Sequence, residues 1–456
     1  MCLLFGDYMK LYLQDNDKVI HNKQMGWVIH TYVDESIKDY NDVDDIYNKC
    51  DNVALLYMWN KLEPNEGDYR FDILNKAILK FTKLNKNIHL RISTDPMIYL
   101  GANGVPEWVF EKYHIKYQTR DDYGCVAKYP DYLNPLYLEK MGNFLKALAN
   151  NIKKYDNILQ IDLRGYGEWG EWHSGYMHEN RAAHNEALRR IIKVWVEAFK
   201  DSNIPLAISS SYEWRSDLPL ALHAPKSFEE YKYFQGFDYA LAFDNITFRR
   251  DGVGGSVRKY DMQIMNEYYI NGKHPMTAEY FIAYLKSLEN SDGVRGYHIE
   301  DALEEALQLH PNYMMLPWDS VAFYKQRQDL VDYGLKRMGF RLLPEEIEIP
   351  LIAKDSYITL KQKWVNHGAG KLCYKHNLVI KLVDENNNET YMEDDSFLSD
   401  KILEGKPYYH NSNISTHNLK GKVSIYLGIC NLKGEFINLP LDNKKGNLYL
   451  VGTFTL

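Results

Sequence analysis

The sequence is poor in cysteine and has no motif that would hold a metal ion. Its five cysteines are scattered and none forms a C-x-x-C pair: Cys2, Cys50, Cys125, Cys373 and Cys430. An odd number of widely spaced cysteines argues against a disulfide framework and against a zinc site. We therefore expect neither a metal ion nor any other cofactor.

The sequence also lacks a basic stripe and a long apolar run. Its net charge is −8 at pH 7, so it offers no cluster of cations to neutralise nucleic-acid phosphates. No segment approaches the roughly 18 apolar residues of a membrane span. The first residues, MCLLFGDYMKLYLQD, do not resemble a secretion signal. These absences argue against nucleic-acid and membrane partners. They predict a soluble, cytoplasmic protein, or a secreted or periplasmic one if a leader was removed.

Up to residue 338, short apolar runs alternate with segments of helical periodicity. Eight runs predict strands: Gly26–Thr31, Val53–Tyr57, Ile88–Ile92, Ile158–Arg164, Leu206–Ser210, Tyr239–Phe243, Pro275–Glu279 and Tyr313–Leu316. The predicted helices include Phe71–Leu84, Tyr137–Tyr155, Arg181–Asp201, Ala278–Leu288 and Val321–Arg337. This alternation predicts an α/β fold, a (β/α)8 TIM barrel over residues 1–338. A doubly wound sheet is the competing architecture, but no glycine-rich phosphate loop follows the first strand.

The composition changes after Gly339. Runs of strand character, separated by turns rich in Asn, Asp and Gly, are Tyr357–Val365, Leu378–Val383, Val423–Ile429 and Leu448–Leu456. This pattern predicts an antiparallel β-sandwich over residues 339–456, which we interpret as an accessory domain.

The fourth predicted strand leads into the most unusual stretch of the sequence. Residues 161–173, IDLRGYGEWGEWH, carry two glutamates, two tryptophans and a histidine on a glycine-broken loop. Carboxyl groups act as acid, base or nucleophile in sugar cleavage, and aromatic faces stack on sugar rings. The alternative interpretation is a packed aromatic turn whose glutamates only cap a helix. Within this stretch, Asp162 and Arg164 are expected to form an ion pair.

Other strand ends carry a family resemblance. Residues 59–72, WNKLEPNEGDYRFD, resemble the W-x-x-x-E-P-x-x-G-x-Y-x-F-D segment of clan A glycoside hydrolases, which include the family 42 β-galactosidases. Residues 104–108, GVPEW, resemble the G-x-P-x-W loop of these enzymes and lie in a long loop-like segment, 94–136. Residues 169–173, WGEWH, resemble a motif in a bacterial branch of these barrel proteins that has a C-terminal β-sandwich. Glu63, Glu66 and Asp72 also have a purely structural interpretation, in a turn or at a helix start.

The resemblance implies two catalytic glutamates. Clan A enzymes place an acid/base glutamate after strand four and a nucleophile at the end of strand seven. Glu279 occupies the second position, and either Glu171, which we favour, or Glu168 occupies the first. Glycine stands where the family has an asparagine before the acid/base glutamate, so the contact of that asparagine with the sugar 2-hydroxyl is made elsewhere or missing. Glu279 also has a structural interpretation as a first-turn helix residue.

Further candidates for substrate binding lie at or beyond the predicted strand ends. They are Trp59, Arg91, Trp108, Trp169, Trp172, His173, Tyr212, Trp214, Asp244 and Trp318. Most are aromatic, and their gathering on the face where a barrel binds substrate is hard to obtain from core packing alone.

The predicted function is that of a retaining glycoside hydrolase, similar to β-galactosidases, acting on β-linked oligo- or polysaccharides. The main rival is a non-catalytic glycan-binding protein on the same barrel, which the missing asparagine favours. A structure with Glu279 more than about 10 Å from both Glu168 and Glu171 would favour that rival. A metal-dependent hydrolase or deacetylase is a further alternative.

Overall fold

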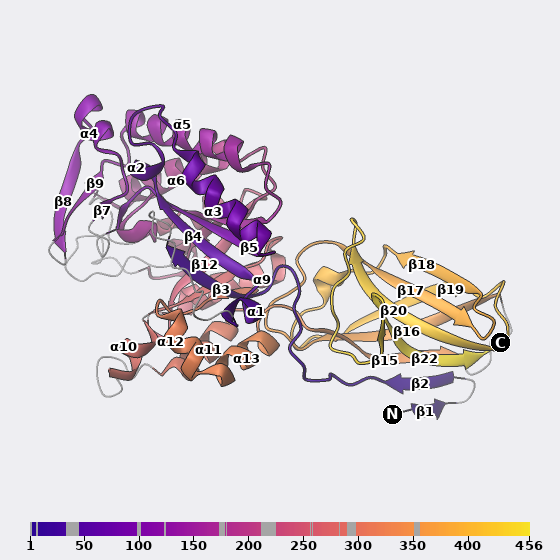
Figure 1. The fold of residues 1–456 in the computed structure, drawn as a ribbon. Coiled ribbons are helices and arrows are strands. Elements are labelled where there is room, and N and C mark those ends of the chain that lie inside the picture. Colours follow the sequence, from indigo (N-terminus) through magenta and orange to yellow (C-terminus); the bar gives the residue numbers. More distant parts are fainter. Residues whose placement is uncertain are drawn as a thin grey trace. The chain divides into compact units, whose positions relative to one another are not determined.

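The chain forms two compact units. The computed structural model describes residues 2–5, 8–32, 45–97, 102–122, 125–172, 178, 180–210, 225–255, 257, 259–281, 283–289, 298–350 and 356–456. The barrel unit comprises Trp27–Leu309 and Met314–Gln328 (Figure 1). The sandwich unit comprises Met1–Gly26, His310–Tyr313 and Asp329–Leu456. Among the described residues, no helix combines the length and the apolar character that crossing a membrane requires.

The barrel unit is built on a closed barrel of eight strands, in the order β10-β11-β12-β13-β14-β3-β4-β5. Their bounds are β3 Gly26–Tyr32, β4 Asn52–Met58, β5 Asn87–Ser93, β10 Ile158–Leu163, β11 Leu206–Ser209, β12 Ile246–Val253, β13 Thr277–Tyr280 and β14 Tyr313–Met315. Pairing is parallel from β3 to β5 and from β5 through β10 to β13. The predicted TIM barrel is confirmed.

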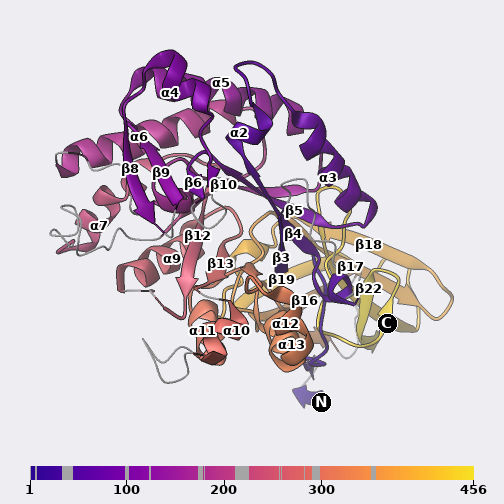
Figure 2. The ribbon, with the colours of Figure 1, turned by 60° about the vertical axis from the view of Figure 1, so that its left-hand side comes forward.

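Helices cover the outside of the barrel. The longer ones are α3 Phe71–Lys83, α5 Pro135–Ile152, α6 Arg181–Ala198, α9 Lys259–Asn271 and α11 Ile299–Leu307. Helix α3 buries Leu74, Ala77, Ile78 and Phe81, which follow the spacing of one helix face. In both views α3, α5 and α6 gather on one side, and α10 Tyr284–Glu289, α11 and α12 Ser320–Gln326 gather on another (Figures 1 and 2).

The sixth strand corrects the sequence analysis. Tyr239–Phe243 is not a strand, because helix α8 Phe237–Ala240 and a turn occupy this segment, and the strand is β12. A five-residue apolar run fits a buried helix as well as a strand. The sequence analysis does not predict strand β12, ITFRRDGV, because this strand carries three charged side chains, although all of them are buried. Rules based on sequence alone place charged residues at the surface.

Three other segments differ from the sequence analysis. The predicted helix Ala278–Leu288 begins as strand β13 and becomes helical only in α10. The predicted helix Val321–Arg337 is divided at Arg327 into α12 and α13 Gln328–Arg337. The loop-like segment 94–136 contains the helix α4 Glu107–Tyr113 and two hairpins: β6 Pro96–Met97 with β7 Ala102–Asn103, and β8 Tyr117–Asp122 with β9 Cys125–Pro130.

The sandwich unit holds two five-stranded sheets, β1-β2-β15-β16-β19 and β18-β17-β20-β22-β21. Their bounds are β1 Cys2–Phe5, β2 Tyr8–Tyr12, β15 Leu342–Pro350, β16 Tyr357–Asn366, β17 His376–Asp384, β18 Glu389–Asp394, β19 Tyr408–Ser415, β20 Lys422–Asn431, β21 Lys444–Lys445 and β22 Leu448–Thr455. The N-terminal residues, assigned to the barrel from sequence, belong here instead, because β2 pairs with β15 from Tyr8↔Pro350 to Tyr12↔Glu346.

Candidate functional site

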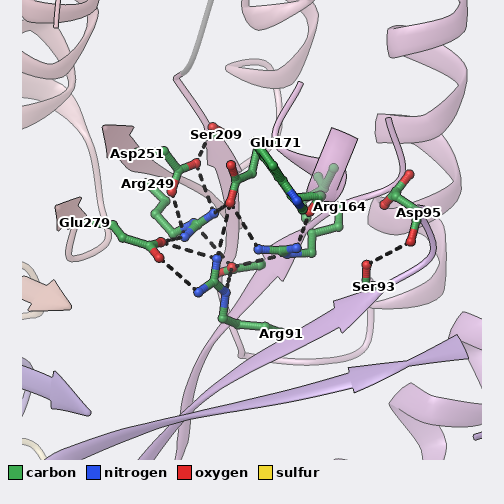
Figure 3. Close-up of polar contacts among 12 residues, drawn as sticks. Arg91, Ser93, Asp95, Arg164, Glu171, Ser209, Arg249, Asp251 and Glu279 are labelled. Carbon is green, nitrogen blue, oxygen red and sulfur yellow. Dashed lines mark hydrogen bonds and ion pairs between the residues drawn. The ribbon is translucent and has the colours of Figure 1, made fainter. Parts of the chain in front are cut away.

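A cluster of charged side chains lies in and just after the barrel strands β5, β10, β12 and β13 (Figure 3). It consists of three arginines and four acids: Arg91, Arg164, Arg249, Asp162, Glu171, Asp251 and Glu279. These residues come from β5, β10, the loop after β10, β12 and β13. Loops and strand ends at the carboxyl-terminal face of a TIM barrel carry the active site in characterised barrel enzymes. We name these seven residues the arginine–carboxylate cluster.

Arg249 is the centre of the cluster and contacts all four acids. Its Nε lies 3.2 Å from Oδ2 of Asp162, and its Nη2 lies 3.3 Å from Oε1 of Glu171. Asp251 is held at two points, with Nη1 to Oδ1 at 2.8 Å and Nη2 to Oδ2 at 2.9 Å. Nη1 also contacts Oε2 of Glu279. The planar fork of a guanidinium group is suited to such shared contacts.

Arg91 and Arg164 complete the network. Arg91 donates from Nε to Oδ2 of Asp162 at 2.9 Å, and its Nη1 and Nη2 lie 3.3 and 3.2 Å from the two carboxylate oxygens of Glu279. The Nη2 atoms of Arg91 and Arg164 both lie 3.6 Å from Oε1 of Glu171. The predicted pair of Asp162 and Arg164 is confirmed at 3.6 Å. All three arginine side chains are only 2% exposed.

Three carboxyl groups of the cluster face one another. Oxygen atoms of Glu171, Asp251 and Glu279 lie within 4.8 Å of one another. The closeness matters because two carboxyl groups about 5–5.5 Å apart are the geometry of a retaining glycosidase. The same triad of acids matches the donor set of a divalent cation. However, Arg249 contacts each of the three, which supplies positive charge where a cation would sit.

Burial and the arginines act in opposite directions on the buried aspartates. Burial alone would raise the pKa of Asp162, but the neighbouring Arg249 and Arg91 outweigh it and lower that pKa. For Asp251 burial prevails over Arg249, and with the nearby Glu279 it raises the pKa to about 6. Asp162 is therefore an anion at neutral pH, whereas Asp251 changes charge around pH 6.

The loop that presents Glu171 is held in an unusual backbone conformation. Trp169 and Trp172 both have positive φ angles, 55° and 67°, which residues other than glycine rarely adopt. Arg164 donates to the carbonyl oxygen of Trp169, and the backbone N–H of Trp172 donates to the carbonyl oxygen of Tyr166 at 3.1 Å. Such strain persists only where the surroundings impose it, and it is common at functional sites.

Asp95 holds the start of this loop through a hydrogen bond. The backbone N–H of Gly165 donates to Oδ2 of Asp95 at 3.0 Å, and the aspartate has no exposed surface. Because Asp95 is buried, its pKa is raised to about 7, although Arg164 and the Gly165 hydrogen bond oppose this shift. Figure 3 shows Asp95 to one side of the cluster, where its backbone carbonyl accepts a hydrogen bond from Ser93. Asp95 thus helps to hold the loop that presents Glu171 in place.

The backbone leaves no room for a side chain directly before Glu171. Gly170 has a φ of +71°, and a Cβ atom there would lie 2.5 Å from Oδ2 of Asp95 and 2.8 Å from Cβ of Arg164. No side chain fits such a space without displacing its neighbours. An asparagine at this position is therefore incompatible with the way Asp95 and Arg164 hold the loop.

An aromatic pair lies beside Glu279. The ring of His30, on β3, stacks on Trp318, which follows β14, with centroids 4.4 Å apart. His30 Nε2 lies 3.6 Å from Oε1 of Glu279. Burial and the nearby Arg91 and Arg249 hold the pKa of His30 well below its ordinary value, so its ring is neutral. Trp318 is partly exposed and thus has surface that a ligand can reach.

The sequence-predicted residues divide into four groups. Glu171, Glu279 and Arg91 meet in the cluster, and Trp318 lies beside it through His30. Glu168, Trp169 and Trp172 lie in the loop after β10; Glu168 and Trp172 are buried, whereas Trp169 is partly exposed and packs against Leu56 and Met58. His173, Tyr212 and Trp214 lie outside the described residues.

The remaining candidates lie away from the cluster. Trp59 is fully buried, donates to Oε2 of Glu63 at 2.7 Å and stacks on Phe144, so it has no free face for a sugar. Trp108 packs edge-on against Trp59 and donates to the carbonyl oxygen of Glu63. Both tryptophans therefore have structural contacts.

Asp244 requires a correction that follows from the sixth strand. It precedes β12 instead of ending a strand, is exposed and pairs with Lys273 at 2.7 Å. Sequence reasoning also missed Arg249, Asp251 and Ser209, whose hydroxyl donates to Oδ2 of Asp251 at 2.8 Å. The available signal was the run Arg249-Arg250-Asp251 behind three strand-forming residues.

One family model matches part of the chain. Residues 39–189 match the family model of glycoside hydrolase family 42, described as beta-galactosidase. No curated protein matches the sequence.

Similar solved structures include endo-glycoceramidase II from Rhodococcus sp. as its lactosyl-enzyme intermediate, at 12% identity and a TM-score of 0.45, covering 89% of this chain and 99% of that one. Another is the catalytic domain of beta-amylase from Paenibacillus polymyxa, at 11% identity and a TM-score of 0.43, covering 66% and 97%. The family match supports a glycosidase. The chain therefore has the (β/α)8 fold of the clan A glycoside hydrolases.

Proposed function

We propose that the protein is a retaining glycoside hydrolase that cleaves β-linked oligo- or polysaccharides by double displacement. The observation that carries this proposal is the approach of Glu171 and Glu279, whose carboxylate oxygens lie within 4.8 Å of each other. The match to a family described as beta-galactosidase supports the same activity and makes β-galactosides the first substrates to try.

The same distance supports this proposal over its alternatives. Inverting enzymes hold the two carboxyl groups about 6.5–9.5 Å apart, to leave room for a water molecule. A gap above about 10 Å would have favoured a non-catalytic glycan-binding protein, because no glycosidase geometry spans it. The observed spacing favours direct attack on the sugar by one of the two glutamates.

Glu279 is the nucleophile in this mechanism and Glu171 the acid/base. Both guanidinium Nη atoms of Arg91 contact Glu279, which aims its carboxylate. In the first step Glu279 forms a bond to the anomeric carbon while Glu171 gives its proton to the departing glycosidic oxygen. In the second step Glu171 takes a proton from water, whose oxygen displaces Glu279 and releases the sugar. Glu171, with a side chain 15% exposed, is the more accessible of the two.

Other residues of this face supply sugar contacts. Trp318, stacked on His30 beside Glu279, offers an aromatic face for the sugar ring. The family's asparagine, which would bind the 2-hydroxyl, cannot stand at Gly170. Arg164 and Arg249 lie next to Glu171 and carry N–H donors suited to the same hydroxyl.

The test is a screen of aryl β-glycosides and plant or mucin oligosaccharides with the wild type, followed by Glu171→Gln and Glu279→Gln on any substrate found. Each substitution keeps the shape and removes the carboxyl chemistry, so we expect kcat to fall at least about a hundredfold. Azide rescue of an alanine variant of Glu279, giving a glycosyl azide of inverted configuration, would identify the nucleophile.

Glu197→Gln, on the exposed surface of α6, is the matched control and should keep wild-type turnover. Turnover that survives both Glu171→Gln and Glu279→Gln would refute the assigned roles. Binding of oligosaccharide without any turnover would favour the glycan-binding rival.

A further inference from the structure

The charge balance of the arginine–carboxylate cluster raises a question about the proton donor. Three guanidinium groups lie 3.3 to 3.6 Å from Oε1 of Glu171. Positive charges beside a carboxyl group favour its ionised form, whereas a proton donor must begin the reaction neutral. Glu171 therefore needs nearby negative charge to offset the arginines.

Asp251 is placed to supply that charge. One of its oxygens lies within 4.8 Å of an oxygen of Glu171 and of an oxygen of Glu279, and its side chain is buried. Arg249 holds both of its oxygens, and the Ser209 hydroxyl donates to Oδ2 from the neighbouring strand β11. The groups that face Asp251 are thus Ser209, Arg249, Glu279, Glu171 and, at longer range, Arg91.

The net charge of the cluster indicates how Asp251 affects Glu171. The three arginines contribute three positive charges, and Asp162, Glu171, Asp251 and Glu279 offer up to four negative ones. With Glu171 protonated, the other three acids balance the arginines. Without Asp251, balance is reached only when Glu171 loses its proton. Without Asp251, Arg249 could also move closer to Glu171 and Glu279. A closer positive charge further favours loss of the proton from Glu171.

We propose that Asp251 is a positioning residue for the glycosidase reaction, which keeps the proton on Glu171 through its own charge and through its hold on Arg249. This inference rests on the proposed function. Asp251 makes no bond to the substrate in this role. Because oxygens of the three acids lie within 4.8 Å of one another, the pH profile of the enzyme reports on the set and not on one residue.

The experiment compares the pH dependence of kcat in the wild type, Asp251→Asn and Ser209→Ala on a substrate found in the screen. We expect Asp251→Asn to move the basic limb of the profile toward acid by about 1 pH unit. Ser209→Ala, which only loosens the hold on Asp251, should move it in the same direction by less. Asp201→Asn, an exposed aspartate after α6, should leave the limb in place. A loss of kcat at every pH with an unmoved limb would overturn the inference.

A second measurement needs no substrate. The inference puts the proton on Glu171, so the wild type should lose stability relative to Glu171→Gln as the pH rises from 5 to 8. We expect the difference in melting temperature to change by at least about 2 °C, and to change less when both proteins also carry Asp251→Asn, whereas Asp201→Asn should leave the change as it is. A difference that stays constant with pH, or that changes equally with and without Asp251, would overturn the inference. If the wild type cleaves no glycoside, the proposed function fails, and this measurement still decides whether Asp251 keeps the proton on Glu171.

Discussion

Replacing Gly170 with alanine tests how the loop that presents Glu171 is held. A Cβ atom at this position would lie 2.5 Å from Oδ2 of Asp95 and 2.8 Å from Cβ of Arg164, and the φ angle is +71°. A left-handed conformation costs a side chain about 1–2 kcal/mol, and overpacking a buried site costs about 1–3 kcal/mol more. Together they predict that Gly170→Ala lowers the free energy of unfolding by about 2–5 kcal/mol.

Gly67 provides the matched control. Its φ angle is +79°, yet a Cβ atom there would meet nothing within 4 Å. Gly67→Ala should therefore show the backbone cost alone, about 1–2 kcal/mol. Urea unfolding followed by tryptophan fluorescence measures both variants, and the difference between them isolates the contact with Asp95 and Arg164.

The same assay tests the departure from the family pattern. Gly170→Asn places an asparagine directly before Glu171, the proposed acid/base, and asparagine tolerates positive φ better than alanine does. Its Cβ meets the same atoms, so this variant should also be destabilised beyond Gly67→Ala, and it should not gain activity. If Gly170→Ala cost no more than Gly67→Ala, our account of the missing asparagine would be refuted.

Two further predictions concern buried charges. Arg249→Met leaves four acids without their shared partner and should cost about 3–5 kcal/mol of stability, while Arg249→Lys keeps the charge and should recover part of it, both measured by urea unfolding. The pKa of Asp95 is raised to about 7, so its contribution to stability is complete below about pH 4 and is lost as the pH rises through 7. Asp95→Asn should therefore gain in melting temperature relative to the wild type between pH 5 and pH 8, and a constant difference would contradict the prediction.

The sequence was most informative where the pattern of apolar residues is regular. Strands β4 and β5 are buried along nearly their whole length, so they appear as apolar runs followed by helices and predict a barrel. Strand β12 breaks this pattern because its arginines and Asp251 are buried inside an ion network. A hydrophobicity pattern cannot register charges whose partners lie on other strands.

The N-terminal strands show a similar limit. β2 pairs with β15, more than 300 residues later, and no local signal in Tyr8–Tyr12 identifies that partner. Sequence analysis therefore assigned these residues to the barrel that follows them. Only the register of the sheet reveals their place in the sandwich unit.

The sequence by itself determined the barrel, the loop with its glutamates and the position of Glu279 at the seventh strand, because these depend on local periodicity and on motifs within short segments. The tertiary structure alone decided which acids meet. Glu171, Asp251 and Glu279 come from three separate parts of the chain, and closure of the barrel brings their carboxylates within 4.8 Å. Their charge states also depend on closure, because burial and the three shared arginines act only once the strands have come together.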